Sequence, residues 1–457
     1  NMPLILPGNV GSATAATGFD VANSCRFDSA SSADLRISDY SGAGTSRKTR
    51  TYSMWIKRSE LSYAVIFGSA GKDHWVFTAD HKIQINIGSG TDSRRITDMV
   101  FRDVSAWYHI VFAYDTTQGT AANRFTMWVN GAVATTSIVA GKNEVAEDEE
   151  ALVFINGDTH TIGSDEDSAS YCDCYMAEWV FVDGQKLDAD SFGEYDSDSG
   201  IWKPKDVSGI TLGTNGFYLN FADSSDLGID AGNDNDFEPT NLTATDQTTD
   251  TCTNNFSTWN PLACAMQNVA NNVTFSEGNL KAVGTSGGEG TLLSTIAVNS
   301  GKWYAEFKMI DVADGNFSQV ALLEEDAALK TTGGTGATVS RGNVTVKPNG
   351  DLFIAETRSQ SWGPTFTDND IIQIAADLDN GAFYFGKNGT YSNSGNPTSG
   401  ASKTGAAYAF TASSKLWFFA GGLNGTGSAV EANFGSPSFT ISSGNTDGDG
   451  YGNFEYA

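Results

Sequence analysis

Long apolar runs are absent from this 457-residue sequence, and their absence excludes one class of protein. No segment approaches the roughly 18 consecutive apolar residues that a membrane-spanning helix needs. The sequence begins with NMPLILPGNV, which is too short for a signal peptide and lacks its basic region and cleavage site. We therefore expect no membrane insertion and synthesis in a cytosol. Any exterior role would then come through assembly into a particle that leaves the cell.

Positive charge is also scarce. Lys and Arg number 27 against 55 Asp and Glu, which gives a net charge of −28. Nucleic-acid binding is disfavoured, because no basic stripe is present to displace counterions from phosphate. The acidic residues form small groups at 147–150, 165–167 and 234–236. Such groups indicate solvated loops, and the alternative is divalent-cation sites at the rims of a sandwich.

Cysteine is too rare to build a disulfide scaffold, since the chain has five, an odd number. Cys252 and Cys264 flank a short loop, and the sequence leaves open whether they pair. Cys172 and Cys174 are separated by one residue, and no second Cys/His pair lies nearby. Zinc binding is therefore disfavoured.

Fifty glycines, nine prolines and 11% aromatic residues favour many strands joined by tight turns. Two similar hairpins stand out. The first is WYHIVFAYD at 107–115 followed by RFTMWVNG at 124–131, and the second is IIQIAADLDNGAFYFGKNG at 371–389. Asn-Gly tolerates the positive φ of a tight hairpin turn. The pattern predicts an all-β fold of two tandem antiparallel β-sandwiches.

Composition divides the chain into five parts. The length suits two domains of roughly 200 residues each. A segment rich in Asp, Asn and Thr shows little strand pattern and is interpreted as a connector. The predicted parts are an N-terminal arm (1–20), a first sandwich (21–223), the connector (224–262), a second sandwich (263–440) and a Gly/Asp-rich tail (441–457) that is a candidate contact segment.

The strand motifs resemble two known families. SMWIKRS, WYHIVFAYD, RFTMWVNG, HTIGS and YMAEWVFVDGQKL, in this order, resemble the concanavalin A-like, laminin-G-type sandwich over residues 20–220. GKWYAEF, DNDIIQIAADLDNGAFYFGKNG and ANFGSP resemble the SPRY domain over residues 265–440. One departure is Asn369-Asp370, where the SPRY family often has Gly-Asp. The resemblance implies a jelly-roll sandwich followed by a SPRY-like sandwich.

The order of these parts, with MPLILPGNV at the start and TNNFSTWNPL at the joint, resembles virion proteins of tailed, especially marine, bacteriophages. This resemblance implies a virion surface protein, a tail fibre or receptor-binding module that contacts host-surface glycan or protein. A capsid decoration or head-fibre protein anchored by its N-terminal arm is the alternative. The implied partners are other virion proteins and further copies of the chain, with a trimer favoured.

Enzymatic chemistry is not supported by any motif. Glucanases of the sandwich fold carry Glu-x-Asp-x-x-Glu on one strand, whose acidic residues serve as nucleophile and general acid. Glu178 and Asp183 are five apart and fall on opposite faces, and the Glu194, Asp196, Asp198 group lacks the closing Glu. The four histidines form no HExxH pair. A glycan-degrading enzyme is the disfavoured alternative, and we expect no catalytic residue.

Two kinds of binding site remain as expectations. Laminin-G-type sandwiches often hold calcium at a loop rim, and no other cofactor is expected; the candidate ligands are Asp165, Asp167, Asp230, Asp234 and Asp236. A glycan site needs an exposed aromatic ring beside hydrogen-bonding side chains. Candidates in Gly/Ser/Asn-rich surroundings are Trp202, Trp362 and Tyr391.

Overall fold

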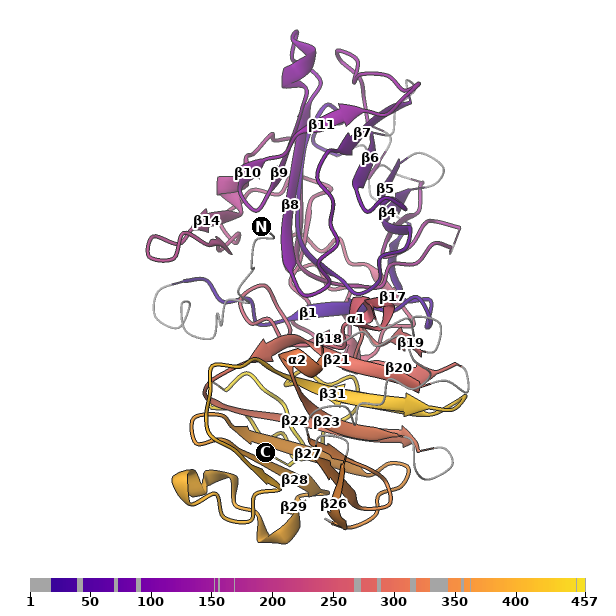
Figure 1. Cartoon of the computed structure of the whole chain (residues 1–457). Coiled ribbons are helices and arrows are strands. Elements are labelled where there is room, and N and C mark those ends of the chain that lie inside the picture. The colour runs from indigo at the N-terminus through magenta and orange to yellow at the C-terminus, as the bar shows by residue number, and fades with distance from the viewer. Residues whose placement is uncertain are drawn as a thin grey trace. The chain divides into compact units, whose positions relative to one another are not determined.

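The computed structural model describes residues 18–456 apart from 39–43, 70–72, 88–91, 152, 155–156, 168, 267–272, 286–288, 313–317, 329–343, 355–356, 362 and 449. Most of the predicted N-terminal arm, residues 1–17, lies outside the described residues. The chain divides into two compact units, residues 1–255 (unit 1) and 256–457 (unit 2), both visible in Figure 1. Antiparallel sheets build both units, so the predicted all-β fold of tandem sandwiches is confirmed.

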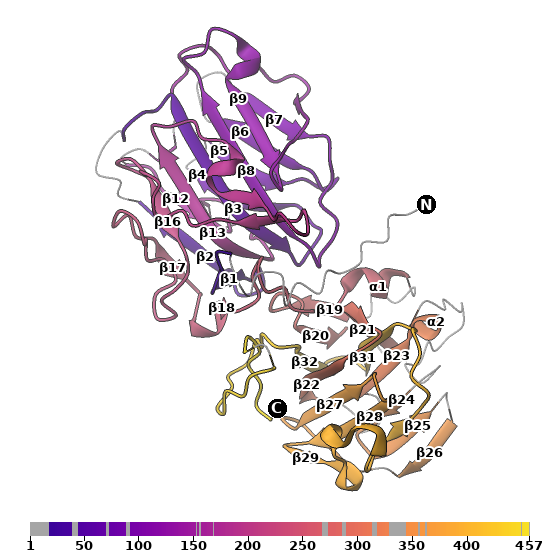
Figure 2. The same ribbon diagram turned by 90° about the vertical axis from the view of Figure 1, so that its left-hand side faces the viewer.

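Unit 1 contains two large sheets with a shared core (Figure 2). Sheet A has the order β10-β9-β8-β3-β13-β1-β18, with β16 beside β13. Its strands are Ala132–Val133 (β10), Phe125–Val129 (β9), Trp107–Asp115 (β8), Thr49–Arg58 (β3), Cys174–Asp183 (β13), Ser24–Phe27 (β1), Gln247–Thr248 (β18) and Phe217–Leu219 (β16).

Sheet B has the order β11-β7-β6-β5-β4-β12-β2-β17. Its strands are Thr136–Ile138 (β11), Ser93–Thr97 (β7), Ile83–Ile87 (β6), Asp73–Phe77 (β5), Ala64–Ser69 (β4), His160–Ile162 (β12), Asp34–Ile37 (β2) and Glu238–Thr240 (β17). All strand pairs in both sheets are antiparallel.

Alternating side chains of sheet A are buried on both of its faces. On β8, Ile110 and Phe112 join the core between the sheets, while Trp107 and Val111 join a second apolar cluster on the outer face. This follows from the two-residue period of a strand. Strand β8 is therefore covered on both sides.

The segment after β13 covers the outer face of sheet A. Ala189, Phe192, Trp202, Val207 and Leu212 all belong to the outer apolar cluster. The segment contains a two-stranded hairpin, Gly193–Tyr195 (β14) and Trp202–Pro204 (β15). Short 3-10 turns in unit 1 are Ala121–Asn123, Ala189–Ser191 and Ala244–Asp246.

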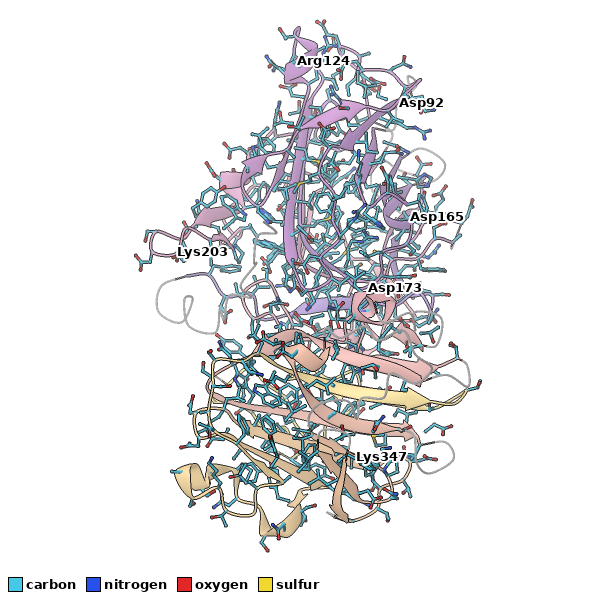
Figure 3. The ribbon with its side chains drawn as sticks, viewed as in Figure 1. Asp92, Arg124, Asp165, Asp173, Lys203 and Lys347 are labelled. Carbon is cyan, nitrogen blue, oxygen red and sulfur yellow. The ribbon has the colours of Figure 1, made fainter. Side chains whose placement is uncertain are left out.

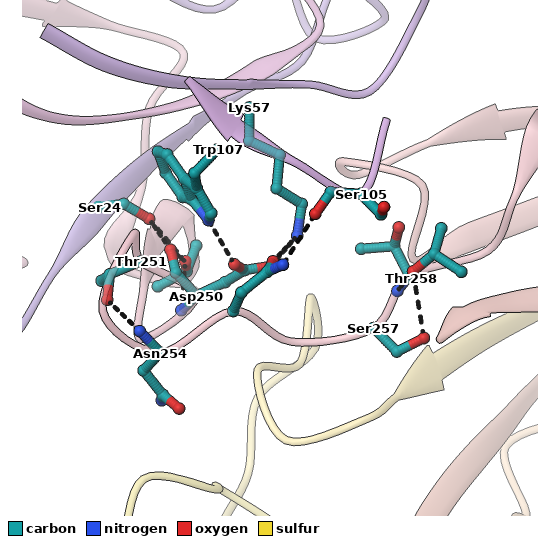
Figure 4. Close-up of polar contacts among 12 residues, drawn as sticks. Ser24, Lys57, Ser105, Trp107, Asp250, Thr251, Asn254, Ser257 and Thr258 are labelled. Atoms are coloured by element: carbon teal, nitrogen blue, oxygen red, sulfur yellow. Dashed lines mark hydrogen bonds and ion pairs between the residues drawn. The ribbon is translucent and has the colours of Figure 1, made fainter. Parts of the chain in front are cut away.

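The predicted connector at 224–262 needs correction, because its residues up to 255 are part of unit 1. Strand β17 pairs with β2, and β18 pairs with β1. Asp250 is buried, where it accepts from Lys57 Nζ at 2.6 Å and from Trp107 Nε1 at 3.1 Å (Figure 4). The polar residues of this segment thus form short edge strands and contribute to a buried ion pair, and they do not form a solvated linker.

Unit 2 also has two large sheets. Sheet E has the order β19-β20-β32-β22-β27-β28-β29, with β30 beside β28. Its strands are Val273–Ser276 (β19), Lys281–Gly284 (β20), Ala429–Asn433 (β32), Lys302–Asp311 (β22), Ile371–Asp377 (β27), Ala382–Lys387 (β28), Thr390–Tyr391 (β29) and Tyr408–Ala409 (β30).

Sheet F has the order β21-β31-β23-β24-β25-β26. Its strands are Glu289–Val298 (β21), Trp417–Asn424 (β31), Gln319–Glu324 (β23), Val344–Val346 (β24), Asp351–Ile354 (β25) and Thr357–Ser361 (β26). The core between sheets E and F includes Trp259, Phe307, Ile374 and Phe383. The remaining described elements are the helices Pro261–Met266 (α1) and Glu325–Ala328 (α2) and the 3-10 turns Ser392–Ser394 and Pro397–Ser402.

The Asn-Gly turns form the hairpins that the sequence predicted. Asn130 and Gly131 have φ of 48° and 77° and join β9 to β10, and Asn388 and Gly389 have φ of 47° and 84° and join β28 to β29. At the β27–β28 turn Gly381 has a φ of 73°. These residue types adopt the left-handed conformation at low cost.

None of the helices in the described part of the chain is long and apolar enough to span a membrane. Cys252 has a free thiol, which answers the open question of its pairing, and Cys25, Cys172 and Cys174 are free and buried. The predicted tail is part of unit 2, since Asn445 and Phe454 form a bridge and the buried Phe454 packs on Tyr304.

Candidate functional site

The β14–β15 hairpin brings together an exposed aromatic residue and a cluster of polar side chains. Tyr195 and Trp202 are direct cross-strand partners in this hairpin. Trp202 is only 7% exposed, whereas Tyr195 is 55% exposed. The hairpin therefore has a buried aromatic residue that anchors it and an exposed one beside it.

Two glycines make room for the Trp202 ring. A Cβ on Gly131 would lie 2.3 Å from the ring, and a Cβ on Gly193 would lie 2.5 Å from it. Gly131 belongs to the β9–β10 turn, and Gly193 begins β14. Trp202 thus fits between the turn and its own hairpin. The predicted glycan-binding role of Trp202 is corrected, because a buried indole cannot offer its face to a sugar.

His109 fixes the position of the Trp202 ring. Trp202 Nε1 donates to His109 Nδ1 at 2.8 Å, and His109 Nε2 lies 2.9 Å from Ser53 Oγ. An indole N–H only donates, so Nδ1 carries no proton and Nε2 donates to Ser53. Burial lowers the pKa of His109 to about 3, which keeps the ring neutral at pH 7. His109 is therefore a core residue.

Tyr195 is braced although it is exposed. Its ring packs edge-on against Trp202, with centroids 4.8 Å apart and planes at 70°. Its hydroxyl donates to the carbonyl oxygen of Asn130 at 3.2 Å. These two contacts hold the ring in one orientation while more than half of its surface faces solvent.

Polar side chains border Tyr195 in the β14–β15 loop. Asp196 Oδ1 accepts from the backbone N–H of Asp198 and Ser199 and from Ser199 Oγ, at 2.9–3.1 Å. The bonds from Ser199, first that of its backbone, lower the pKa of Asp196 to about 2. Lys203 Nζ lies 3.3 Å from Asp196 and 3.4 Å from Glu194. The loop is thus held in shape from within, and Glu194 and Asp198 remain exposed.

Two exposed apolar residues lie on the β14–β15 and β9–β10 hairpins. Ile201 precedes β15 and is 48% exposed, and Val133 on the edge strand β10 is 70% exposed. Val133 pairs across the strands with Trp128, which packs against the outer apolar cluster. We name the Tyr195 platform as Tyr195, Ile201 and Val133 with the polar border Glu194, Asp198 and Lys203. Figure 3 labels Lys203 on this projecting hairpin.

The other two aromatic candidates do not form a comparable surface. Trp362 lies outside the described residues. Tyr391 on β29 is partly buried and packs against Tyr384, with ring centroids 6.4 Å apart. Burial, with a smaller effect of Glu306, raises the pKa of Tyr391. Tyr391 is part of the outer packing of sheet E.

The predicted calcium ligands are distributed over two loops. Asp230 is buried, and its two oxygens accept four backbone N–H groups, from Tyr218, Gly232, Asn233 and Asn235, at 2.7–3.0 Å. These four bonds use the lone pairs of the carboxylate, so Asp230 has none left for a cation. Asp236 accepts from the N–H of Asp230 at 2.8 Å, and Asp234 is exposed. This loop is organised by its own backbone bonds.

Asp165 and Asp167 lie in the other loop, after β12. Asp165 accepts from the N–H of Ala169 at 2.8 Å, and Asp167 is exposed. Figure 3 has Asp165 at the opposite edge of unit 1 from Lys203. Across the described ranges, no three His, Cys, Asp or Glu side chains are grouped so as to hold a metal ion. The predicted residues therefore do not fit a shared calcium site.

Glu178 and Asp183 do not form a catalytic pair in this geometry. Asp183 accepts from the backbone N–H groups of Ser46 at 3.1 Å and Asn215 at 3.2 Å, among others. Glu178 accepts from the Tyr218 hydroxyl at 2.7 Å on the outer side of sheet A. The two carboxylates face opposite sides of β13, as the sequence predicted.

The sequence analysis selected Trp202 of this hairpin as a candidate and missed its cross-strand partner Tyr195. The signal was present in GEYDSDSGIWKP at 193–204, where two aromatic residues flank a Ser/Asp turn. Directly opposite residues of an antiparallel pair lie on the same face, so the pairing predicts contact between the two rings but not which of them is covered. Which one is covered depends on Gly131, which is distant in sequence.

Comparison with known proteins finds a family model that is similar to part of unit 1. Residues 29–189 match a model described as the concanavalin A-like lectin/glucanases superfamily. This match agrees with the first resemblance drawn from the sequence, and it ends before the β14–β15 hairpin. No curated protein sequence matches the chain significantly.

Several solved structures are similar to parts of the chain. The SPRY domain of human HERC1 is 18% identical, with 38% of this chain and 96% of that domain covered and a TM-score of 0.28. A heptameric SAP-like pentraxin from Limulus polyphemus is 14% identical, with 37% and 80% covered and a TM-score of 0.26. A putative carbohydrate binding protein from Bacteroides ovatus is 12% identical, with 49% and 58% covered and a TM-score of 0.34.

Proposed function

We propose that this chain is a non-catalytic binding protein and that the Tyr195 platform of unit 1 binds a carbohydrate. The observation that carries the proposal is an aromatic ring that is 55% exposed yet held by Trp202 and Asn130. Tyrosine supplies a rigid, amphipathic contact surface at low entropic cost. A ring fixed before binding loses little conformational freedom when a ligand packs on it.

The polar border favours a particular class of glycan. Glu194 and Asp198 are exposed carboxylates of the same hairpin, and Lys203 provides one ammonium donor. The carboxylates disfavour sulfated or uronic acid sugars, because like charges repel. The proposed ligand is a neutral, hydroxyl-rich glycan whose C–H face packs on Tyr195. The lectins named in the matching family description support carbohydrate as the ligand class.

Calcium has no part in this proposal, because the described carboxylates do not converge on a common point. The absence of catalysis is also part of the proposal. It is supported by Glu178 and Asp183, which face opposite sides of β13 and are bonded to their own surroundings. Release of reducing sugar from a bound polysaccharide would overturn this part of the proposal.

We further propose that the chain works on the surface of a tailed-bacteriophage virion, as a tail fibre or receptor-binding module that contacts the host. The order of the sequence motifs supports this setting. The alternative is a capsid decoration protein anchored by residues 1–20. Locating the chain in purified virions by immunoelectron microscopy separates the two, and its absence from virions would reject both.

The platform is tested on a glycan array with the full chain and two substitutions. Tyr195→Ala should weaken binding of the best neutral glycan at least about tenfold, equal to about 1.4 kcal/mol. Tyr63→Ala is the matched control, because Tyr63 is a comparably exposed tyrosine of unit 1, at 49%. Equal loss in both variants, or no binding of any neutral glycan by the native chain, would contradict the proposal.

A further inference from the structure

A fully buried carboxylate on sheet E of unit 2 holds the C-terminal segment of the chain. Glu306 is 0% exposed and lies in the middle of β22. Its Oε1 accepts from the backbone N–H of Tyr456 at 2.7 Å, and its Oε2 accepts from the backbone N–H of Glu455 at 3.0 Å. One side chain therefore binds two consecutive peptide groups.

Neighbouring side chains complete the site and orient the carboxylate. Tyr304 donates to Glu306 Oε1 at 2.8 Å, and Asn433 Nδ2 donates to Oε2 at 3.1 Å. Asn433 Nδ2 also donates to the carbonyl oxygen of Asn453 at 2.8 Å. Gln373 Nε2 donates to Tyr304 Oη at 3.1 Å and to the carbonyl oxygen of Tyr456 at 3.3 Å. We name Glu306, Tyr304, Asn433 and Gln373 the Glu306 cradle.

The cradle recognises an extended segment mainly by its backbone. Residues 453–456 contribute two N–H groups and two carbonyl oxygens to the contacts just described. Side-chain selectivity comes from Phe454, which is 3% exposed and packs edge-on against Tyr304 at 5.0 Å. The Tyr456 ring lies over the β28–β29 turn, where a Cβ on Gly389 would come within 3.0 Å of it. Backbone bonds with side-chain anchors are a common mode of peptide recognition.

The segment that precedes the docked residues is exposed and polar. Residues 440–452 contain Gly, Ser, Asp and Asn, and most of those described are exposed. Hydrogen bonds from Ser442 and Asn445 go to Glu455, inside the C-terminal loop itself. Figure 2 shows this loop in yellow beside β32 and β22. Fully extended, residues 440–452 would span roughly 40 Å, enough to reach a neighbouring molecule.

We propose that the Glu306 cradle is a peptide-docking site that also accepts the C-terminal segment of a second copy of this chain. All cradle atoms belong to one part of the chain and all docked atoms to another. The contacts are therefore the same whether both come from one copy or from two. Exchange of the segment links copies without any new interface. This inference concerns unit 2 and does not depend on glycan binding by unit 1.

The test uses two full-length variants that are each defective in one half of the contact. Glu306→Gln replaces one acceptor oxygen by an amide that donates, so the cradle is impaired and the segment is intact. Phe454→Ala removes the buried ring, so the segment is impaired and the cradle is intact. Differently tagged variants are mixed and analysed by native mass spectrometry. We expect the mixture to contain at least tenfold more dimer than either variant alone.

Glu431→Gln on the adjacent strand β32 is the matched control for the cradle variant, and its mixture with Phe454→Ala should show no such gain. A mixture of the two defective variants that stays as monomeric as each alone, while both keep a cooperative thermal transition, would overturn the proposal. If Glu306→Gln fails to fold, a fluorescent peptide of residues 441–456 provides the second measurement. It should bind Phe454→Ala saturably and at least tenfold more tightly than it binds the native chain. Absence of binding to Phe454→Ala would equally overturn the proposal.

Discussion

Gly131 and Gly193 determine which aromatic side chain of the β14–β15 hairpin reaches solvent. A side chain at either position would occupy the space of the Trp202 ring. Trp202 is buried and donates a hydrogen bond to His109, and the Tyr195 ring packs edge-on against it. The exposed ring of the platform thus depends on the absence of two β-carbons.

Gly131→Ala is predicted to destabilise unit 1 by about 2 kcal/mol more than Gly141→Ala, because overpacking adds to the backbone strain. The two glycines have nearly equal φ, 77° and 78°, but a Cβ on Gly141 would meet nothing within 4 Å. Urea denaturation monitored by tryptophan fluorescence measures the difference. Equal destabilisation would mean that Trp202 moves aside at no cost.

The sequence indicates the hairpin of the candidate site but not which of its aromatic residues is exposed. Aromatic residues on both sides of a Ser/Asp turn are visible in residues 193–204. The burial of Trp202 depends on Gly131 and His109, which a single sequence does not connect to it. Asp230 was a reasonable calcium candidate by composition, yet its oxygens serve four backbone groups of its own surroundings.

At the scale of elements, strand β13 contains a local irregularity with a chemical consequence. The pairing of β13 with β3 shifts between Ala177 and Val180, and Glu178 within the shift has a φ of 49°. Such a bulge inserts an extra residue and directs its side chain away from the regular alternation. Glu178 consequently reaches Tyr218 on the outer side of sheet A, in a largely buried position.

Glu178→Gln is predicted to stabilise unit 1 at high pH. Burial raises the pKa of Glu178 to about 7, above its ordinary value of 4.5. Because the folded pKa is raised, the protonated acid's contribution to stability is complete below pH 4.5 and is lost as pH rises through about 7. An uncharged Gln avoids this loss, and we expect a gain of about 2 kcal/mol at pH 8 that disappears near pH 4.5.

Urea denaturation at pH 4.5 and pH 8 provides the measurement for this prediction. Glu238→Gln on β17 is the control, because Glu238 is exposed and the exchange should leave stability nearly unchanged at both pH values. A gain for Glu178→Gln that is the same at both pH values would show that the charge of Glu178 is not its cause.

Elements with strong local sequence signals could be predicted, whereas elements with weak local signals could not. The hairpins at Asn130-Gly131 and Asn388-Gly389 follow from residues that favour a positive φ. Strands β17 and β18 have three and two residues and consist of Glu, Pro, Thr and Gln. Their pairing with β2 and β1 is set by tertiary contacts, which in β17 override the low strand propensity of Glu and Pro.

At the scale of the whole molecule, the described polar contacts of residues 224–255 make them necessary to unit 1. A fragment of residues 18–255 is predicted to unfold cooperatively, whereas a fragment of residues 18–223 lacks β17, β18 and Asp250. Lys57 would then be left without its carboxylate partner, a loss of about 3–5 kcal/mol for a buried pair. Circular dichroism melts of both fragments measure this difference.

Asp250→Asn in the 18–255 fragment is the control that isolates the ion pair from the two edge strands. Its melting temperature should lie between those of the two fragments, because it keeps β17 and β18. Equal melting temperatures for residues 18–255 and 18–223 would mean that the segment is a linker after all.

The pairing of β1 with β18 also affects how the protein is made. Ser24 and Thr248 are register partners. Strand β1 therefore cannot pair with β18 until more than two hundred further residues have been synthesised. At 5–20 residues per second, a ribosome takes roughly 10–45 s to synthesise the intervening chain. During that interval β1 has an open edge, which is a template for pairing with another nascent chain. Unit 1 should therefore be most prone to aggregation before its synthesis is complete, and slower translation would extend that risk.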